Sequence, residues 1–278
     1  LTGAAGIGVT RLIDELTHRL RGLPGLVVAR GAALDSCAGE AYQALGAALG
    51  SALATLDDDA VRRVVRHSGH DLGLVLRDSA DRLDALGIDR SPPRLTAPEQ
   101  VGSRVQEAIL GALERLAGDG VVLLALEDLH RADPATRGFV RALLRVGRPL
   151  RIGLVLSYQP DELNRRHPAR ELATALQADP TVEHLALGPL DAGSVGRLVA
   201  SLQGDRPAGD VLAAVMEGSA GNPLMATQLV AAEGSLEGVR LSDPFEQVVS
   251  ARLEALPGGP RRVIRLLAAA RQPLPRSL

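Results

Sequence analysis

Hydrophobic residues recur along the chain with two different periods. In the segment 11–23, which follows a glycine-rich start, they return every three or four positions and predict a helix. Four other segments are short, largely apolar and bounded by turn or charged residues, as buried strands are: GLVVAR (25–30), VVLLAL (121–126), RIGLVLSY (151–158) and VEHLAL (182–187). Because helical patterns separate them, the sequence predicts an α/β domain with a mostly parallel sheet flanked by helices.

The helical patterns divide the chain in two. Six of them alternate with the strands: 40–55, 58–68, 76–86, 99–117, 135–146 and 168–177. Beyond Gly188-Pro189-Leu190 no strand pattern follows, and five more helices are predicted: 191–203, 208–218, 223–232, 244–256 and 259–270. We therefore expect an α/β domain over 1–189 and, over 190–278, a smaller helical lid domain with the start of a following helical region.

Composition narrows the classes of function. The hydrophobic content of 46% is ample for a core, whereas aromatic side chains are too few for base stacking on nucleic acid. The net charge of -2 gives no overall attraction for DNA or anionic lipid. A single cysteine, Cys37, excludes an internal disulfide, and no apolar run is long enough for a transmembrane helix. A cytoplasmic protein with no membrane partner is expected.

The glycine-rich start carries the first candidate chemistry. Residues 3–10, GAAGIGVT, match the phosphate-loop pattern G-x-x-x-x-G-K-[ST] at every fixed position except the lysine, which is Val9. The glycines allow backbone N–H groups to surround phosphates at a helix N-terminus, and Thr10 can hold Mg²⁺. Without the lysine, a glycine-rich turn before a helix is an equally good interpretation of this segment alone.

The predicted strand 121–126 carries the second candidate chemistry. It ends in Glu127-Asp128, as in a Walker B motif, where a buried parallel strand delivers two carboxylates to its carboxyl end. A strand that merely ends in an acidic turn is the alternative. The glycine-rich segment upstream, in the right order and context, favours the Walker B interpretation.

Four segments resemble one family. EDLHRADPAT (127–136) is similar to the segment DDLHWADPAT of the large ATP-binding regulators of the LuxR type, in the signal-transducing (STAND) branch of AAA+-like ATPases. SYQPDEL (157–163), LGPLD (187–191) and GNPLMATQLV (221–230) resemble its TYRPDEL strand ending, its linker and its GNPFF motif. The resemblance implies a P-loop NTPase fold that binds ATP or ADP with Mg²⁺.

The resemblance also implies residue roles. Glu127 would be the acid on the Mg²⁺ side, Asp128 would orient the attacking water, and these two are the predicted catalytic residues. Thr10 and Glu127 are the predicted metal ligands. Gln159 replaces the sensor arginine of the family, and Pro223 would pack against adenine unless it is only a helix-starting proline. The predicted nucleotide contacts are Gly3, Ala4, Ala5, Gly6, Ile7, Gly8, Val9, Thr10, Arg11, Gln159 and Pro223.

Two histidine sites carry less weight. His67, His70 and Asp71 have metal-like spacing, but an intervening Ser-Gly turn and the lack of a further ligand argue against a metal site. His130 beside the acidic pair is predicted to be a structural histidine rather than a general base.

These patterns favour an ATP- or ADP-binding regulatory module of a signal-transducing transcriptional regulator, with slow ATP hydrolysis or none. A pseudo-ATPase that serves as a protein-interaction scaffold is the alternative, and an active AAA+ motor with an arginine finger from a neighbouring subunit is a third hypothesis. DNA would be bound only by a helix-turn-helix domain that this chain does not contain, and self-association is considered as well. Because the glycine-rich segment begins two residues into the chain, we expect a fragment with a truncated first strand.

Overall fold

The structure, a computed structural model, describes residues 1–34, 40–66, 68–91, 98–146, 149–232, 250, 253–254 and 256–270. The chain forms two compact units. The first contains Leu1–Thr2 and Thr10–Leu185, and the second contains Gly3–Val9 and Ala186–Leu278. The predicted domain boundary at 189/190 stays a prediction. Cys37 and His67 lie outside the described residues.

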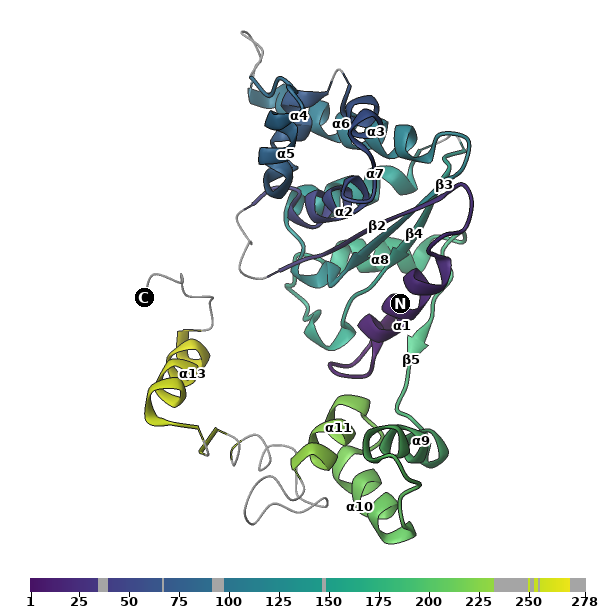
Figure 1. Ribbon diagram of the computed structural model, residues 1–278, viewed down its shortest axis with the longest axis vertical. Helices are drawn as coiled ribbons and strands as arrows, with labels where there is room; N and C mark the ends of the chain where they lie inside the picture. The colour runs from purple at the N-terminus through teal and green to yellow at the C-terminus, as the bar shows by residue number, and fades with distance from the viewer. Residues whose placement is uncertain are drawn as a thin grey trace. The chain divides into compact units, whose positions relative to one another are not determined.

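The first unit is built on a parallel sheet, as predicted. Its strands are β2 (Leu26–Ala32), β3 (Val121–Glu127) and β4 (Ile152–Leu156), in the order β2-β3-β4 (Figure 1). The two-residue strands β1 (Thr2–Gly3) and β5 (Ala186–Leu187) pair with each other, and a parallel bridge joins Thr2 to Tyr158 just after β4. Only the last two residues of the predicted strand 182–187 are therefore in a strand.

Most predicted helices of this unit are present. They are α1 (Val9–Leu20), α2 (Gln43–Leu53), α3 (Asp58–Val65), α6 (Pro98–Ala117), α7 (Pro134–Leu144) and α8 (Arg170–Ala178). A further short helix, α4 (Gly69–Gly73), was not predicted, and the predicted helix 76–86 is instead a 3₁₀ turn (Arg77–Ser79) followed by α5 (Ala80–Ala85). The chain leaves helical geometry at Leu76 because Val75 and Leu76 are buried, and the Val75 carbonyl packs where Gly46 of α2 has no Cβ.

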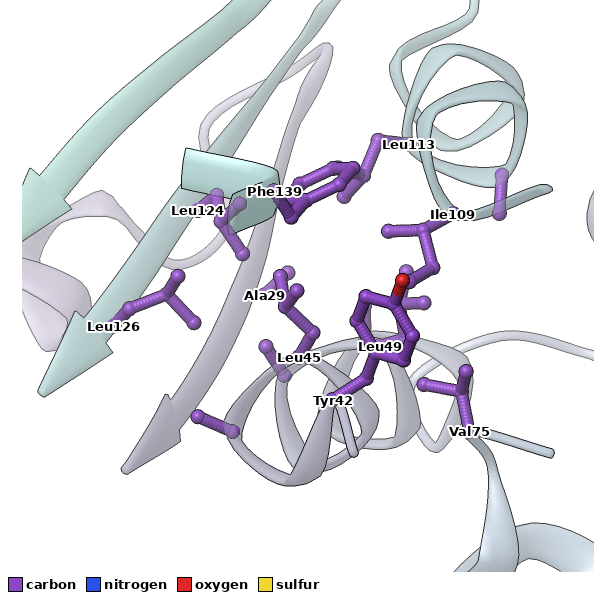
Figure 2. Close-up of a cluster of buried hydrophobic side chains, with 14 of the residues drawn as sticks. Ala29, Tyr42, Leu45, Leu49, Val75, Ile109, Leu113, Leu124, Leu126 and Phe139 are labelled. Carbon is purple, nitrogen blue, oxygen red and sulfur yellow. The ribbon is translucent and has the colours of Figure 1, made fainter. Parts of the chain in front are cut away.

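The core of the first unit is aliphatic, as the composition requires. Side chains from β2, β3, α2, α6 and α7 meet in one buried cluster (Figure 2). Its labelled members include Ala29, Leu45, Leu49, Ile109, Leu113, Leu124, Leu126 and Phe139. Helix α2 lies close to β2 because Gly31 has no side chain: a Cβ there would lie 2.0 Å from the carbonyl oxygen of Ala44. Leu124 and Leu126 face this cluster, so the side chains that alternate with them point to the opposite face of the sheet.

The second unit contains three packed helices, α9 (Ala192–Gln203), α10 (Gly209–Ser219) and α11 (Pro223–Ala232). They bury a small aliphatic core of their own, formed by Val195, Val199, Val215, Ala226, Leu229 and Ala232. Helix α13 (Gly258–Ala270) follows, and the predicted helix 244–256 falls largely outside the described residues. Within the described ranges, every helix is too short or too polar to cross a membrane.

Candidate functional site

The segment Gly3–Val9, called the glycine loop below, has an unusual backbone. Gly6 has a φ of +76° and Gly8 a φ of +104°, a region that side chains disfavour. Among the described residues, the N–H groups of Gly6 and Gly8 donate to no backbone carbonyl. Helix α1 begins at Val9, so its first N–H groups have no acceptor within the helix. The loop therefore presents free backbone donors at a helix N-terminus, the arrangement that binds phosphate groups.

No side chain of the glycine loop carries a positive charge. A Cβ added to Gly3 would lie 2.4 Å from Cγ2 of Ile7 and 3.2 Å from Cγ2 of Val9, so both branched side chains pack beside Gly3. Ile7 is buried and Val9 half-buried. Ala4 and Ala5 are exposed. Val9 thus adds apolar packing where a phosphate loop usually has its lysine.

The start of α1 is solvent-accessible. Thr10 and Arg11 are both exposed, so the Thr10 hydroxyl is accessible to a ligand. Arg11 lies 3.5 Å from the carboxylate of Glu15 one turn along the helix, an exposed ion pair that contributes little to stability.

The glycine loop is hydrogen-bonded to the start of α11 within the second unit. The side-chain amide of Asn222 donates to the carbonyl oxygen of Ala5 over 2.9 Å, and the backbone N–H of Leu224 donates to the carbonyl oxygen of Gly6 over 3.2 Å. Asn222 also caps α11, because its Oδ1 accepts from the N–H groups of Leu224 (3.0 Å) and Met225 (3.2 Å). Asn222 therefore orders both the helix start and the Ala5 carbonyl, and the N–H groups of Gly6 and Gly8 stay free.

Pro223, between these contacts, is the first residue of α11. This position suits a proline on backbone grounds alone, since no N–H is needed there. Its predicted contact with adenine stays a prediction.

The carboxyl end of β3, Glu127-Asp128, is in the first unit and has two different environments. Glu127 is 4% exposed, whereas the side chain of Asp128 is 34% exposed. Asp128 has a φ of 56° and a ψ of 43°, a left-handed conformation rare for a residue with a side chain. Ser157 stabilises it: its Oγ accepts from the N–H of Asp128 (3.1 Å), and its carbonyl oxygen accepts from the N–H of Leu129 (2.8 Å). Such strain is typical of functional sites, and the carboxylate of this residue is partly exposed to solvent.

Glu127 is in an ion-paired chain of three residues. Nε of Arg30, on β2, donates to Oε1 of Glu127 over 2.7 Å, and Nη1 of Arg30 donates to Oδ1 of Asp14 on α1. The register pairs Arg30 with Ala125, so Arg30 and Glu127 share the sheet face opposite Leu124 and Leu126. Burial disfavours the charged form of Arg30, but the hydrogen bonds to both carboxylates outweigh it and raise the pKa of this guanidinium. Arg30 therefore carries its charge at every physiological pH.

His130 lies just after the strained Asp128. It is 3% exposed, and its Nε2 accepts from Nε of Arg131 over 3.1 Å. With Nε2 as the acceptor, a neutral ring carries its proton on Nδ1, which is 4.0 Å from Oδ1 of Asp128 and 3.4 Å from the backbone nitrogen of Gln159. Burial lowers the pKa of His130, although the nearby Asp128 opposes this shift. A neutral, buried histidine agrees with the predicted structural role.

Asp133 fixes the segment that follows. Its Oδ1 accepts from the N–H groups of Thr136 and Tyr42, each over 2.9 Å, and its Oδ2 accepts from the Thr136 hydroxyl over 2.6 Å. The buried carboxylate thus caps α7 and attaches the start of α2 to it.

The structure places the predicted residues in separate groups. Gly3–Val9 form the loop of the second unit, together with Pro223, whereas Thr10, Glu127, Asp128 and Gln159 belong to the first unit. Gln159 is half-buried and follows β4. The predicted catalytic, nucleotide-binding and metal-binding roles stay predictions.

The two predicted Mg²⁺ ligands differ in how available they are to a metal ion. The hydroxyl of Thr10 is exposed, but the carboxylate of Glu127 already accepts a charged hydrogen bond from Arg30. The described part of the chain has no group of three or more His, Cys, Asp or Glu side chains arranged for a metal ion. His70 and Asp71 are engaged elsewhere: Nδ1 of His70 is 2.9 Å from the carbonyl oxygen of Arg90, and Asp71 pairs with Arg104.

Sequence reasoning missed several residues that build these sites. Arg30 is a cation at the end of the apolar run LVVAR, and a charge inside a buried strand signals a partner on the same face. Asn222 precedes a proline at a predicted helix start, the place of an N-cap. The partners of Arg30 are far from it in sequence, and no local pattern indicates them.

A parallel sheet flanked by helices, with a glycine loop before α1 and two acids at the carboxyl end of β3, defines a P-loop type of nucleotide-binding fold. The family model described as "AAA ATPase domain" matches residues 1–157, more than half of the chain. The chain therefore belongs to the AAA ATPase domain family. None of the curated proteins with which the chain was compared matches it.

Proposed function

We propose that this chain is a nucleotide-binding regulatory module that binds ATP or ADP through the glycine loop and hydrolyses ATP slowly or not at all. The observation that carries the proposal is the row of free backbone N–H groups at Gly6, Gly8 and the start of α1. These groups bind phosphate whatever side chain occupies position 9, because the donors belong to the backbone.

Slow hydrolysis follows from the side chains. Neither Val9 nor Gln159 supplies the positive charge that the transferring phosphate needs in its transition state. Asp128, the more exposed of the two predicted catalytic acids, would orient the attacking water. Membership of the AAA ATPase domain family supports nucleotide binding. The role in transcriptional regulation rests on the similarity of 127–136 to the LuxR-type regulators.

Thermal melting of the whole chain with ATP, with ADP and with adenosine tests the proposal. Ligand that binds the folded state raises its stability by RT ln(1 + [L]/Kd). We expect both nucleotides to raise the melting temperature and adenosine, which lacks phosphates, to leave it unchanged. Val9→Lys should bind ATP about tenfold to a hundredfold more tightly, the effect of one hydrogen bond to a charged group.

Gly6→Ala is the matched loss-of-binding variant. A Cβ on Gly6 would lie 2.8 Å from Cβ of Leu224 and would distort the loop without changing any charge. We expect it to lose the nucleotide-dependent shift in both the wild-type and the Val9→Lys backgrounds. If neither the wild type nor Val9→Lys responds to nucleotide, the proposal is wrong.

The second candidate is a scaffold that keeps the fold and binds no nucleotide. The packing of Val9 beside Gly3 favours it, because this apolar contact stabilises the loop without any ligand. It predicts a melting temperature that is the same with ATP, ADP and adenosine. A response of Val9→Lys alone would indicate a loop that retains its shape and has lost its ligand.

A further inference from the structure

The ionic network Asp14–Arg30–Glu127 includes the predicted metal ligand Glu127, and none of its three residues is among the predicted nucleotide contacts. Its three side chains come from α1, β2 and β3, and all belong to the first unit. Glu127 is nearly inaccessible, with its side chain 5% exposed, and Arg30 is 28% exposed. This is a partly buried ionic network at the carboxyl end of the sheet.

Such a network changes what Glu127 can do. A Mg²⁺ ion is bound by one or two carboxylates at about 2.0–2.1 Å and demands a near-octahedral set of oxygens. The guanidinium of Arg30 already donates to Oε1 of Glu127, and its positive charge repels a cation at the same carboxylate. A metal can bind Oε1 of Glu127 only after Arg30 has left, and Arg30 is held a second time by Asp14.

We propose that Arg30 and Asp14 are positioning residues that keep Glu127 out of metal coordination, so that nucleotide binding by this chain depends little on Mg²⁺. The inference rests on the proposed function for its nucleotide part. Its structural part stands independently: without Arg30, the carboxylates of Asp14 and Glu127 face each other across the space that one cation occupied. Two carboxylates around one position supply two oxygen ligands for a divalent cation, and water molecules complete its coordination.

A cavity of about 680 Å³ beside these residues gives solvent a route to them. Arg30 and Glu127 line it, together with Thr17 and Arg21 from α1 and the following turn. A hydrated cation therefore reaches the position of Arg30 without unfolding of the sheet.

Manganese titration, followed by electron paramagnetic resonance, tests the inference on the whole chain. Mn²⁺ accepts the same oxygen ligands as Mg²⁺ and is observed directly. We expect Arg30→Gln to bind Mn²⁺ at least about tenfold more tightly than the wild type, because two carboxylates are freed at once. Arg30→Gln combined with Asp14→Asn should lose most of this gain. Arg21→Gln, an exposed arginine on the same cavity, is the matched control and should behave as the wild type.

Melting temperatures supply a second measurement. In a chelator, Arg30→Gln should melt on the order of 5 °C below the wild type, because removal of one partner leaves the others of this partly buried network unpaired. Added Mg²⁺ should restore much of this loss in Arg30→Gln and have little effect on the wild type. A loss that Mg²⁺ does not restore, together with unchanged Mn²⁺ binding, would overturn the inference.

The predicted independence of nucleotide binding from Mg²⁺ is tested separately. The affinity of the wild type for ATP should differ less than about threefold between chelator and Mg²⁺, about 0.7 kcal/mol. If Arg30→Gln does not fold, the wild type decides: its complex with ADP should hold Mn²⁺ no more tightly than free ADP does. Tighter binding of Mn²⁺ by the complex would overturn the inference. Absence of nucleotide binding under every condition would instead refute the proposed function, while the Mn²⁺ titration of Arg30→Gln would still decide the role of Arg30.

Discussion

The glycine loop and the carboxyl end of β3 build their chemistry from different parts of the chain. The loop presents backbone N–H groups, and its side chains are small or packed away. The end of β3 presents side chains, and most of them are already paired: Glu127 with Arg30, His130 with Arg131 and Asp133 with Thr136. A function carried by the backbone survives substitution at Val9, whereas a function carried by side chains depends on each partner.

The largest effect that we expect concerns the paired side chains at and after the carboxyl end of β3, called the paired region below. Asp133→Ala removes a buried carboxylate that accepts three hydrogen bonds and leaves the N–H of Tyr42 without its acceptor. We expect a loss of about 3 kcal/mol in the free energy of unfolding, since a cap and a buried acceptor disappear together. Urea denaturation followed by circular dichroism measures it.

Asp57→Ala is the control for this substitution. Asp57 caps α3 in an exposed position and accepts one hydrogen bond, from the N–H of Ala60 over 2.7 Å. Its loss should cost about 1 kcal/mol. Equal losses for the two variants would mean that the network around Asp133 adds nothing to an ordinary helix cap.

Substitution of two glycines tests the glycine loop in the same way. Gly6→Ala and Gly8→Ala both force a positive φ on a residue with a Cβ, but only Gly6 also has Leu224 and Asn222 within 3.0 Å of that Cβ. We expect Gly6→Ala to cost about 2 kcal/mol and Gly8→Ala about 1 kcal/mol in thermal unfolding. A larger cost at Gly8 would show that backbone strain outweighs the contact with α11.

The pH dependence of stability tests the paired region again. Burial lowers the pKa of His130 below its ordinary value of 6.5, so the unfolded chain binds a proton that the folded chain does not. Stability is therefore complete above pH 6.5 and is lost as the pH falls toward the folded pKa, with a slope of up to about 1.4 kcal/mol per pH unit.

Urea midpoints between about pH 5 and pH 8 measure this slope, a range above the titration of ordinary carboxylates. His130→Gln should flatten it. A slope that persists in His130→Gln would assign the titration to another histidine.

Much of this fold follows from local patterns. The continuous apolar runs predicted β2, β3 and β4, and the glycine pattern before segment 11–23 located the loop and α1. The break before α5 could not be predicted, because it depends on the packing of Val75 against Gly46 of α2, which is distant in sequence.

The candidate sites were predicted less completely. Residue types indicated Glu127 and Asp128 but not their opposite environments, since the partner of Glu127 is on β2 and the hydrogen bonds that support the strained Asp128 come from Ser157. A charge inside one buried strand signals that a partner exists, but neither strand alone identifies that partner. The residues of the glycine loop were identified from the local sequence pattern alone. Their contact with Asn222, which is distant in sequence, became visible only in the folded structure.

The smallest effect concerns that contact. Asn222→Ala removes the cap of α11 and the hydrogen bond to the Ala5 carbonyl, whereas Asn222→Asp keeps an oxygen for the cap and loses only the donor. Asp191→Ala removes a comparable cap at α9, where the Asp191 carboxylate accepts from the N–H of Ser194 over 2.6 Å. We expect about 1 kcal/mol for Asn222→Ala and less for Asn222→Asp.

Hydrogen exchange at the Ile7 amide, which donates to the carbonyl oxygen of Ala4 over 3.2 Å within the loop, separates the two roles of Asn222. It should be faster in both Asn222 variants and unchanged in Asp191→Ala, because the side chain of Asn222 donates to the loop and that of Asp191 does not. Unchanged exchange in Asn222→Asp would mean that the glycines and the packing of Ile7 and Val9 alone set the shape of the loop. In that case the shape of the glycine loop would be independent of α11. The loop would then differ still more from the carboxyl end of β3, where the side chains depend on their partners.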